Sequence, residues 1–365
     1  MLTTLLLALA PQEAPHEPHG SLDPHEIHVG AVVDVLATAR DGTDDGLDAE
    51  LRALEIELGG SIDDHWSVRA VGVADADGIA IEEAAIAWSG ADPRVSFSFG
   101  RFFADFGPTM REHVHELPYV DRPLVLEAFL GDELGGSGIE YAGRFRLGAR
   151  STVRTTLGIF AGLGEEVGGT SVEFGERRRS GDLDLVARLT HELGPPSGAR
   201  LRYGLSLRRL GRFAFADDDL GLGVAGLENT VLGVEATLGG LDRGTDPPWT
   251  FGGEFLVADG ALGAVRAAGG TSLVVVDDRA SGWYLWGERR LGARDALGVV
   301  LGSVERGEPG LPRESHASVA WTHRPVEHVR VRVEVGGTFG DASTDETRVA
   351  VQITATLGSH SHAGE

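Results

Sequence analysis

The chain has 365 residues with no cysteine, and all 32 of its basic side chains are arginines. Its formal net charge of −24 argues against nucleic-acid binding, because there is no net basic surface to displace counterions from a phosphate backbone. No apolar stretch reaches the ~18 residues that a transmembrane helix needs, so a helical membrane protein is also excluded. The absence of cysteine rules out a disulfide framework.

The two ends of the chain differ in composition from the rest. Residues 1–10 form a short apolar segment that ends in Ala8-Leu9-Ala10, and this pattern predicts a signal peptide. Residues 11–26 are rich in proline, glutamate and histidine, which predicts a flexible leader. Residues 359–365 form a histidine-containing tail. The region between them, residues 27–358, has one continuous pattern and predicts a single domain.

That pattern is an alternation of apolar and polar residues with period two, as in Arg330-Val331-Arg332-Val333-Glu334-Val335. Side chains on a strand point to opposite faces in turn, so each such run predicts a strand with one apolar face. We count about sixteen runs of about ten residues, the length that crosses a bilayer at a tilt. They begin near Ile27, Glu50, Trp66, Ile79, Val95, Gly138, Thr152, Asp182, Arg200, Asn229, Trp249, Ser281, Asp295, His316, His328 and Glu346.

Short and long connections alternate between these runs. The short ones, such as GARS and GPPSGA, have the glycine, proline and aspartate of tight turns. We predict that external loops include residues 37–48, 102–137, 163–180, 211–227, 259–280 and 305–314. An even number of strands with short turns at one rim is typical of bacterial outer-membrane proteins. The sequence therefore predicts an all-β fold, a transmembrane antiparallel β-barrel of about 16 strands in the bacterial outer membrane.

Period two also divides the charged residues of the strands from the lipid-facing ones. A charge on the lipid face costs about 2 to 4 kcal/mol near the midplane, so the arginines of apolar strands should face the lumen. Two interpretations stay open: these side chains select solutes, or they only solvate a wet wall. The predicted pore-lining residues are Glu140, Arg144, Arg146, Arg154, Arg200, Arg202, Arg330 and Arg332.

The longest connection follows the fifth predicted strand. Counted from a periplasmic N-terminus, it is the third external loop, and we expect it to fold inward and narrow the channel. The predicted constriction residues are Glu112, Glu116, Asp121, Arg122, Asp132 and Glu133.

This loop contains His113-Val114-His115, which places two imidazoles on the same side of an extended segment. Carboxylates from the same loop could complete a zinc-type site of nitrogen and oxygen ligands. The alternative is an ordered loop whose histidines only pin it to the wall, with Arg122 paired to Asp121 or to Glu127.

Residues 100–133, GRFFADFGPTMREHVHELPYVDRPLVLEAFLGDE, resemble a segment of porin-like outer-membrane β-barrel proteins that are often labelled zinc-regulated outer-membrane receptors. The resemblance implies an outer-membrane barrel linked to metal supply. Its matching positions are Gly100, Phe106, Gly107, His113, His115, Asp121, Arg122, Pro123, Gly131 and Asp132. A receptor that depends on TonB needs a plug domain and a barrel of about 22 strands. A chain of 365 residues cannot supply both.

We find no cysteine nucleophile, no G-x-S-x-G turn, no H-E-x-x-H helix and no P-loop, so we expect no enzyme. The function we expect is an outer-membrane diffusion channel for small hydrophilic solutes. The alternatives are a metal-binding or zinc-uptake protein and a closed structural barrel. The expected partners are the lipid bilayer and small solutes or a metal ion, with zinc as the one candidate cofactor and a homotrimer left open.

Overall fold

The structure is a computed structural model that describes most of the chain. The described residues are 27–41, 46–75, 78–90, 92, 94–131, 133–164, 166–167, 170–175, 179–195, 198–217, 222–239, 249–267, 272–305, 313–340 and 345–358. The predicted signal peptide, leader and tail lie outside the described residues.

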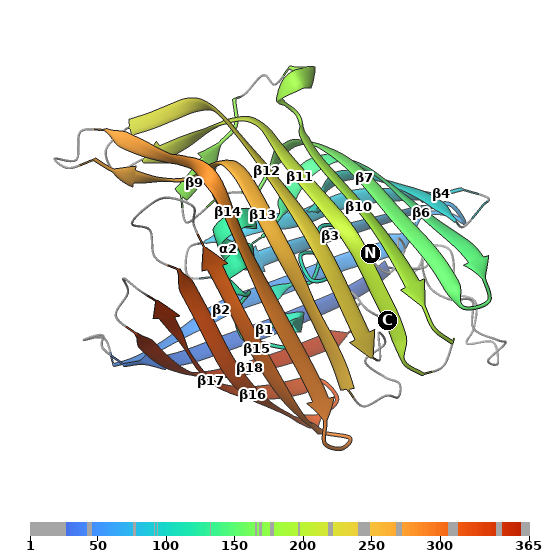
Figure 1. The fold of residues 1–365 in the computed structure, drawn as a ribbon. Coiled ribbons are helices and arrows are strands. Elements are labelled where there is room, and N and C mark those ends of the chain that lie inside the picture. The colour runs from blue at the N-terminus through green and yellow to red at the C-terminus, as the bar shows by residue number, and fades with distance from the viewer. Residues whose placement is uncertain are drawn as a thin grey trace.

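Sixteen strands form the wall of the molecule (Figure 1). They are β1 (Ile27–Arg40), β2 (Leu47–Ser61), β3 (Trp66–Ala74), β4 (Ile79–Ser89), β5 (Val95–Phe103), β6 (Gly135–Gly148), β7 (Ser151–Leu163), β10 (Asp184–Leu193), β11 (Arg200–Asp217), β12 (Leu222–Gly239), β13 (Trp249–Arg266), β14 (Leu273–Arg290), β15 (Asp295–Glu305), β16 (Glu314–Val326), β17 (Val329–Gly340) and β18 (Glu346–Gly358).

Each strand of the wall pairs antiparallel with its neighbours. β1 pairs with β18 in a register that places Ala31 opposite Leu357, and this pairing closes the sheet. β7 pairs with β10. Between them in the sequence, β8 (Glu166–Val167) and β9 (Thr170–Glu173) form a hairpin, and β9 also pairs with the end of β11. The predicted closed antiparallel barrel of sixteen strands is confirmed.

The strands are apolar outside and polar inside, as β2 demonstrates. Ile56 and Leu58 are about half exposed, at 51% and 46%, whereas Glu55 and Glu57 are each only 4% exposed. In water this arrangement would leave apolar surface hydrated and charged groups desolvated, both at a cost in free energy. It is favourable when the outer surface meets lipid and the inner one holds polar partners. The chain is therefore a membrane-spanning barrel of the bacterial outer-membrane type.

The predicted external loops 211–227 and 259–280 are wrong in extent. The strands β11, β12, β13 and β14 have 18 residues each and continue through most of both ranges. The pairing of β11 with β12 shifts register between Leu210 and Phe213, and that of β13 with β14 shifts between Ala261 and Gly263. At such an irregularity the inward positions change from one set of alternate residues to the other. The alternation of apolar and polar residues is therefore interrupted in the sequence before the strand itself ends.

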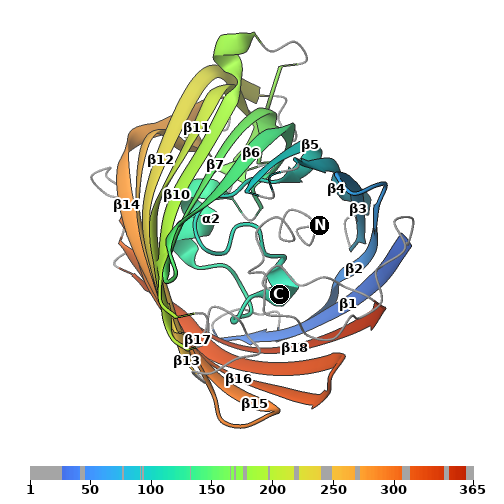
Figure 2. The same ribbon diagram turned by 90° about the vertical axis from the view of Figure 1, so that its right-hand side faces the viewer.

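The longest connection lies inside the barrel. Residues 104–134, which we call the lumen loop, contain the 3₁₀ turn η1 (Val114–Glu116) and the short helix α2 (Leu124–Leu130). Figure 2, which looks into the barrel, shows this segment surrounded by the strands. Among the described residues no helix is long and apolar enough to cross a membrane.

The hydrophobic core lies between the lumen loop and the wall. Leu126 and Phe129 of α2 are almost completely buried, in one cluster with Phe215 of β11 and Leu256 of β13. Phe213 and Phe215 reach this cluster because they follow the irregularity in β11. The apolar residues at the ends of these strands therefore pack against the loop.

Candidate channel constriction

The lumen loop leaves β5 through a turn that requires glycine. Gly107 has a φ of +58°, and a Cβ there would lie 2.7 Å from Oε2 of Glu254 on β13. Its backbone N–H donates a hydrogen bond of 3.0 Å to Oγ of Ser206 on β11. A side chain at this position would displace the Glu254 carboxylate and would need the left-handed backbone that favours glycine.

Asp105 attaches the start of the loop to β7 and β10. Its carboxylate forms an ion pair of 2.6 Å with Arg188 and accepts a hydrogen bond of 3.0 Å from Oγ1 of Thr156. Burial by itself would raise the pKa of Asp105, but the charges of Arg188 and Arg111 outweigh it and hold that pKa below its ordinary value. Asp105 therefore stays ionised at neutral pH.

Glu140 was predicted to line the pore, and the structure places it beneath the loop. Arg111 of the loop forms an ion pair with the Glu140 carboxylate and donates a hydrogen bond of 3.2 Å to the carbonyl oxygen of Phe103. Glu140 is 1% exposed. Its inward direction agrees with period two, but its contact is with the loop.

A second group of wall residues holds the middle of the loop. Arg332 on β17 donates a hydrogen bond of 2.8 Å to the carbonyl oxygen of Tyr119, and Glu334 accepts one of 3.1 Å from the N–H of Val120. Arg52 on β2 donates a hydrogen bond of 2.7 Å to the Val120 carbonyl oxygen. Arg332, like Glu140, is buried at 1% exposure against the loop.

Asp121 and Arg122 are neighbours in the loop and bond to different parts of the protein. Asp121 is bound by two wall arginines, Arg52 at 3.2 Å and Arg348 on β18. Arg122 donates hydrogen bonds to the carbonyl oxygens of Thr109 at 3.1 Å and Glu112 at 2.8 Å. These two bonds stabilise the fold of the loop itself, and the expected pairing of Arg122 with Asp121 or Glu127 stays a prediction.

The end of the helix α2 is attached to β11. Arg208 donates hydrogen bonds from Nη2 to the Phe129 carbonyl oxygen at 2.8 Å and to the Asn229 side chain at 2.5 Å. The carbonyl groups at the end of a helix lack partners within the helix, so a buried guanidinium is a suitable donor there.

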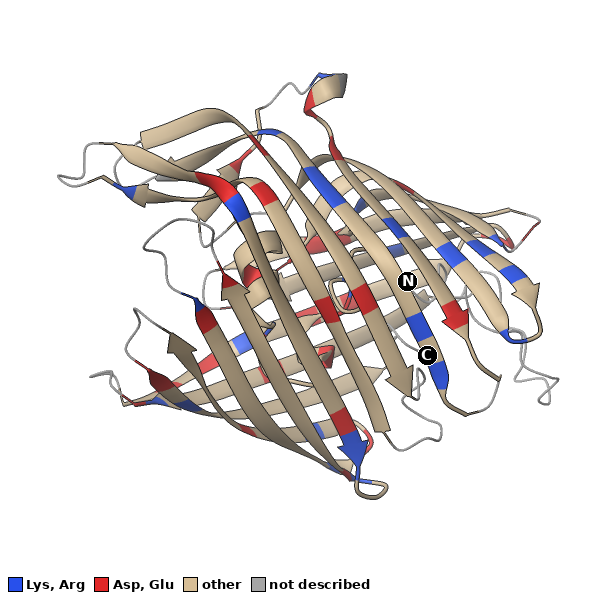
Figure 3. Cartoon of the chain, in the orientation of Figure 1, with Lys and Arg blue, Asp and Glu red and all other residues tan. Residues whose placement is uncertain are grey.

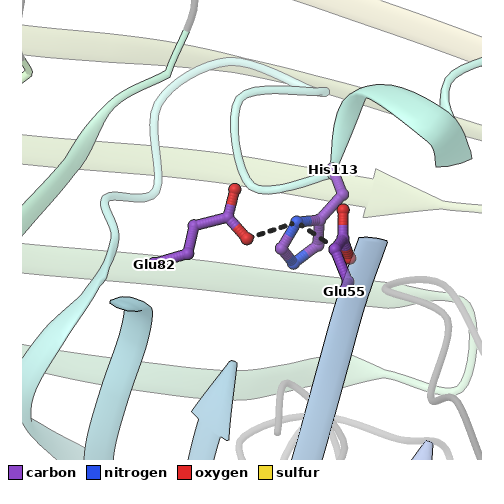
Figure 4. Close-up of side chains that lie close together, drawn as sticks. All are labelled: Glu55, Glu82 and His113. Atoms are coloured by element: carbon purple, nitrogen blue, oxygen red, sulfur yellow. Dashed lines mark ion pairs between the residues drawn. The ribbon is translucent and has the colours of Figure 1, made fainter. Parts of the chain in front are cut away.

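His113 lies beside three glutamates of the wall, and Figure 4 shows two of them, Glu55 and Glu82. Its Nδ1 is 3.2 Å from Glu82 and 3.7 Å from Glu55, and its Nε2 is 3.4 Å from Glu83. Glu82 and Glu83 are neighbours in β4, and both reach His113 because the register with β3 shifts there and leaves Glu82 as the extra residue of a bulge. The ring of His115 is stacked on that of His113, with centroids 5.6 Å apart.

The protonation of His113 follows from these neighbours. Burial by itself would lower its pKa, but the charge of Glu55 and hydrogen bonds to Glu82 and Glu83 outweigh burial and raise the pKa well above the ordinary 6.5. The imidazole is therefore positively charged at neutral pH. The carboxylates that surround it come from β2 and β4 and not, as the sequence suggested, from the same loop.

The arginines predicted to line the pore gather towards the short turns of β6, β7 and β11. Arg144 lies directly opposite Arg154 in the register, and Arg202 lies opposite Glu192. Glu192 forms ion pairs with Arg200 at 3.3 Å and with Arg154 at 3.6 Å. Figure 3 shows basic residues repeated along these neighbouring strands. Glu192 thus pairs with two guanidinium groups in a part of the wall where arginines lie close together.

The remaining predicted residues are dispersed. Arg146 is exposed near the turn after β6, and Arg330 is half-buried and donates a hydrogen bond of 3.2 Å to Thr354. Glu116 is buried in η1, Glu133 is half-buried at the end of the loop, and Asp132 lies outside the described residues.

Several wall residues that hold the loop, such as Arg52, Arg348 and Glu334, were missed by sequence reasoning. A signal was present for some of them, because the inward positions of β2 carry Glu55 and Glu57 while the outward ones are apolar. The pair Glu82-Glu83 interrupts an otherwise apolar strand, which is a signal for a bulge. The contact of these residues with the loop has no local signature.

Comparison with known proteins finds likeness in structure alone. No protein-family model and no curated protein matches the chain. An anion-selective porin from Comamonas acidovorans has a TM-score of 0.61 and 10% identity, over 91% of this chain and 99% of that one. The in-vitro folded trimer form of OmpT from Vibrio cholerae has a TM-score of 0.59 and 12% identity, over 92% and 100%. The outer-membrane channel DcaP of Acinetobacter baumannii has a TM-score of 0.57 and 13% identity, over 92% and 99%.

At these identities the likeness concerns the fold. This chain has the barrel fold of bacterial outer-membrane porins, in agreement with the porin-like part of the resemblance. The label of a zinc-regulated receptor finds no support in the comparisons and stays a prediction.

Proposed function

We propose that this chain is a diffusion channel for small hydrophilic solutes, with the lumen loop as its constriction. The observation that carries the proposal is the attachment of one loop to widely separated strands. Asp105 binds Arg188 on β10, whereas Val120 binds Arg52 on β2 and Glu334 on β17. A loop held at its start and in its middle keeps a fixed place inside the barrel, and solutes would pass beside it.

The charge of the wall suggests which solutes would pass most easily. Arg144, Arg154, Arg200 and Arg202 gather around Glu192 towards the short turns. A lumen lined by one sign of charge concentrates ions of the opposite sign. We therefore infer a preference for anions or zwitterions, despite the negative charge of the whole chain.

Electrical recording from the refolded full chain in planar lipid bilayers tests this proposal. We expect the conductance to rise in steps. In a salt gradient, the reversal potential should have the sign that indicates a preference for anions over cations. Correct folding is checked first, by the shift in electrophoretic mobility that a folded barrel loses on boiling. A folded protein without conductance steps would support the alternative of a closed structural barrel.

We assign no enzymatic activity, and the related solved structures are described as porins, channels and outer-membrane proteins. OmpT of Vibrio cholerae is described in a trimer form. A homotrimer is the assembly we propose for this chain as well, and chemical cross-linking in native membranes would detect it.

A further inference from the structure

We propose that Glu55, Glu82 and His113 bind one divalent transition-metal ion, which fastens the lumen loop to the barrel wall. The three residues come from β2, from β4 and from the loop (Figure 4). This site is separate from the arginine-rich part of the wall, and it does not depend on the channel function.

The distances between the donor atoms suit a single ion. One ligand atom from each of the three residues lies within 4.8 Å of the others. Nδ1 of His113 is 3.2 Å from Oε2 of Glu82 and 3.7 Å from Oε2 of Glu55. A tetrahedral ion with bonds of about 2.0 to 2.2 Å holds its ligands about 3.3 to 3.6 Å apart. Small shifts of these side chains would therefore complete the coordination.

His113 is the residue that points to a ligand. It is 2% exposed, and its ring stands between two carboxylates, with Nδ1 3.2 Å from Glu82 and Nε2 3.4 Å from Glu83. A histidine that ligates a metal gives up the proton of the ligating nitrogen, so a divalent ion at Nδ1 would replace one positive charge by two among these carboxylates. The ion would also bring Glu55 and Glu82 to bonding distance.

Two neighbours would orient the ligands. A histidine bound to a metal usually donates its other N–H to a carboxylate, and Glu83 lies 3.4 Å from Nε2 of His113. On the other side, Nδ1 of His115 is 3.0 Å from Oε1 of Glu55, the oxygen not facing His113. His115, which the sequence suggested as a ligand, would thus position Glu55.

The charge of the surroundings favours a cation. Five buried or nearly buried carboxylates belong to this region, and Arg69 pairs with two of them, Glu57 and Glu83, at 2.9 Å each. Even with both histidines protonated, the group keeps a net negative charge. These carboxylates are Glu55, Glu57, Glu82, Glu83 and Glu116.

The mixed ligands also indicate which ion. Calcium and magnesium prefer oxygen ligands alone, whereas imidazole suits zinc and related transition metals. One histidine with two carboxylates is therefore suited to Zn²⁺, with a water molecule able to complete a tetrahedral site.

Titration of the refolded full chain with Zn²⁺ tests the site. Metal content after dialysis and calorimetry would be compared among the wild type, Glu82→Gln and His113→Gln. All three proteins keep the terminal histidines, so background binding is the same. We expect each variant to lose one equivalent of Zn²⁺. The matched control is His191→Gln, since His191 bonds to Ser151 and Tyr203 away from the loop and should leave that equivalent in place.

A second measurement keeps the test valid if a variant folds poorly. Co²⁺ bound by the folded wild type should give the strong visible absorption of a tetrahedral site, and Zn²⁺ should displace it. Glu83→Gln should weaken binding by about 10- to 100-fold without abolishing it. The proposal is overturned if the wild type gives only the weak spectrum of hydrated Co²⁺, or if folded Glu82→Gln and His113→Gln bind Zn²⁺ as it does. Because conductance is recorded without zinc, the channel and the metal site can fail independently.

Discussion

Nη1 of Arg332 lies 2.8 Å from the carbonyl oxygen of Tyr119, 213 residues away in the sequence, and donates a hydrogen bond to it. Arg332 also contacts Gln352 and Thr322, at 3.1 Å each, so this buried guanidinium has partners on both the loop and the wall. The position of the lumen loop thus depends directly on the strands β16, β17 and β18.

Replacing Arg332 by methionine should loosen the lumen loop. The change leaves the Tyr119 carbonyl oxygen without this donor, and a hydrogen bond to a charged group contributes about 1.5 to 3 kcal/mol. We expect larger current fluctuations in single-channel records and roughly tenfold or faster proteolysis within the loop. The control is Arg209→Met, which removes an arginine that pairs with Glu228 on the exposed side of the barrel. Identical fluctuations in both variants would contradict the anchoring role.

Acid should release the start of the loop. Burial would raise the pKa of Asp105, but Arg188 and Arg111 outweigh it and hold the pKa below the ordinary 3.8. Because the pKa of Asp105 is lower in the docked loop than in the released one, ionised Asp105 stabilises docking fully above pH 3.8. This stabilisation is lost as the pH falls below 3.8 and through the lowered pKa. Proteolysis by an acid-stable protease should accelerate in that window. In Asp105→Asn the rate of proteolysis should depend less on pH. The same pH dependence in this variant as in the wild type would refute the role of Asp105 in docking the loop.

Removing two arginines of the wall should change ion selectivity. Arg144 and Arg154 face each other in the register, so the double variant Arg144→Ser, Arg154→Ser removes two neighbouring charges from the lumen. We expect the reversal potential in a salt gradient to move towards cations. Arg279→Ser removes a charge from an exposed position on β14 and should leave the potential in place. If the reversal potential shifted equally in the double variant and in Arg279→Ser, the effect would come from the total charge of the protein and not from the lumen.

The orientation of the barrel can be tested with single cysteines, because the chain has none. Asp41 follows β1 and Arg150 lies in the turn between β6 and β7, at opposite ends of the strands. Asp41→Cys should react with an impermeant thiol reagent on intact cells, whereas Arg150→Cys should react only after lysis. The reverse pattern would invert the proposed topology.

The barrel could be predicted from the sequence because its cause is local. Each strand must present apolar side chains to lipid and polar ones to the lumen, so alternation is visible in a few neighbouring residues. The runs that begin at Ile27, Trp66 and Trp249 start where the strands do. The inward direction of Arg332 and Glu140 followed from the same rule.

The ends of β11 and β13 could not be predicted in this way. Their alternation is interrupted at the irregularities, and Phe213 and Phe215 then face the lumen loop in place of lipid. An apolar residue that packs against a loop inside the barrel has the same sequence signature as one in a connection.

The partners of His113 belong to the tertiary structure. Period two determined that Glu55 faces inward, and the His-x-His motif marked the loop, but nothing local joins them. Glu55 and Glu82 lie near each other because β2 and β4 both pair with β3, and His113 joins them because the loop folds across the interior of the barrel. The sequence by itself thus determined the wall, since lipid imposes a repeating local pattern. Only the tertiary structure decided what the loop contacts, because those contacts join residues far apart in the chain.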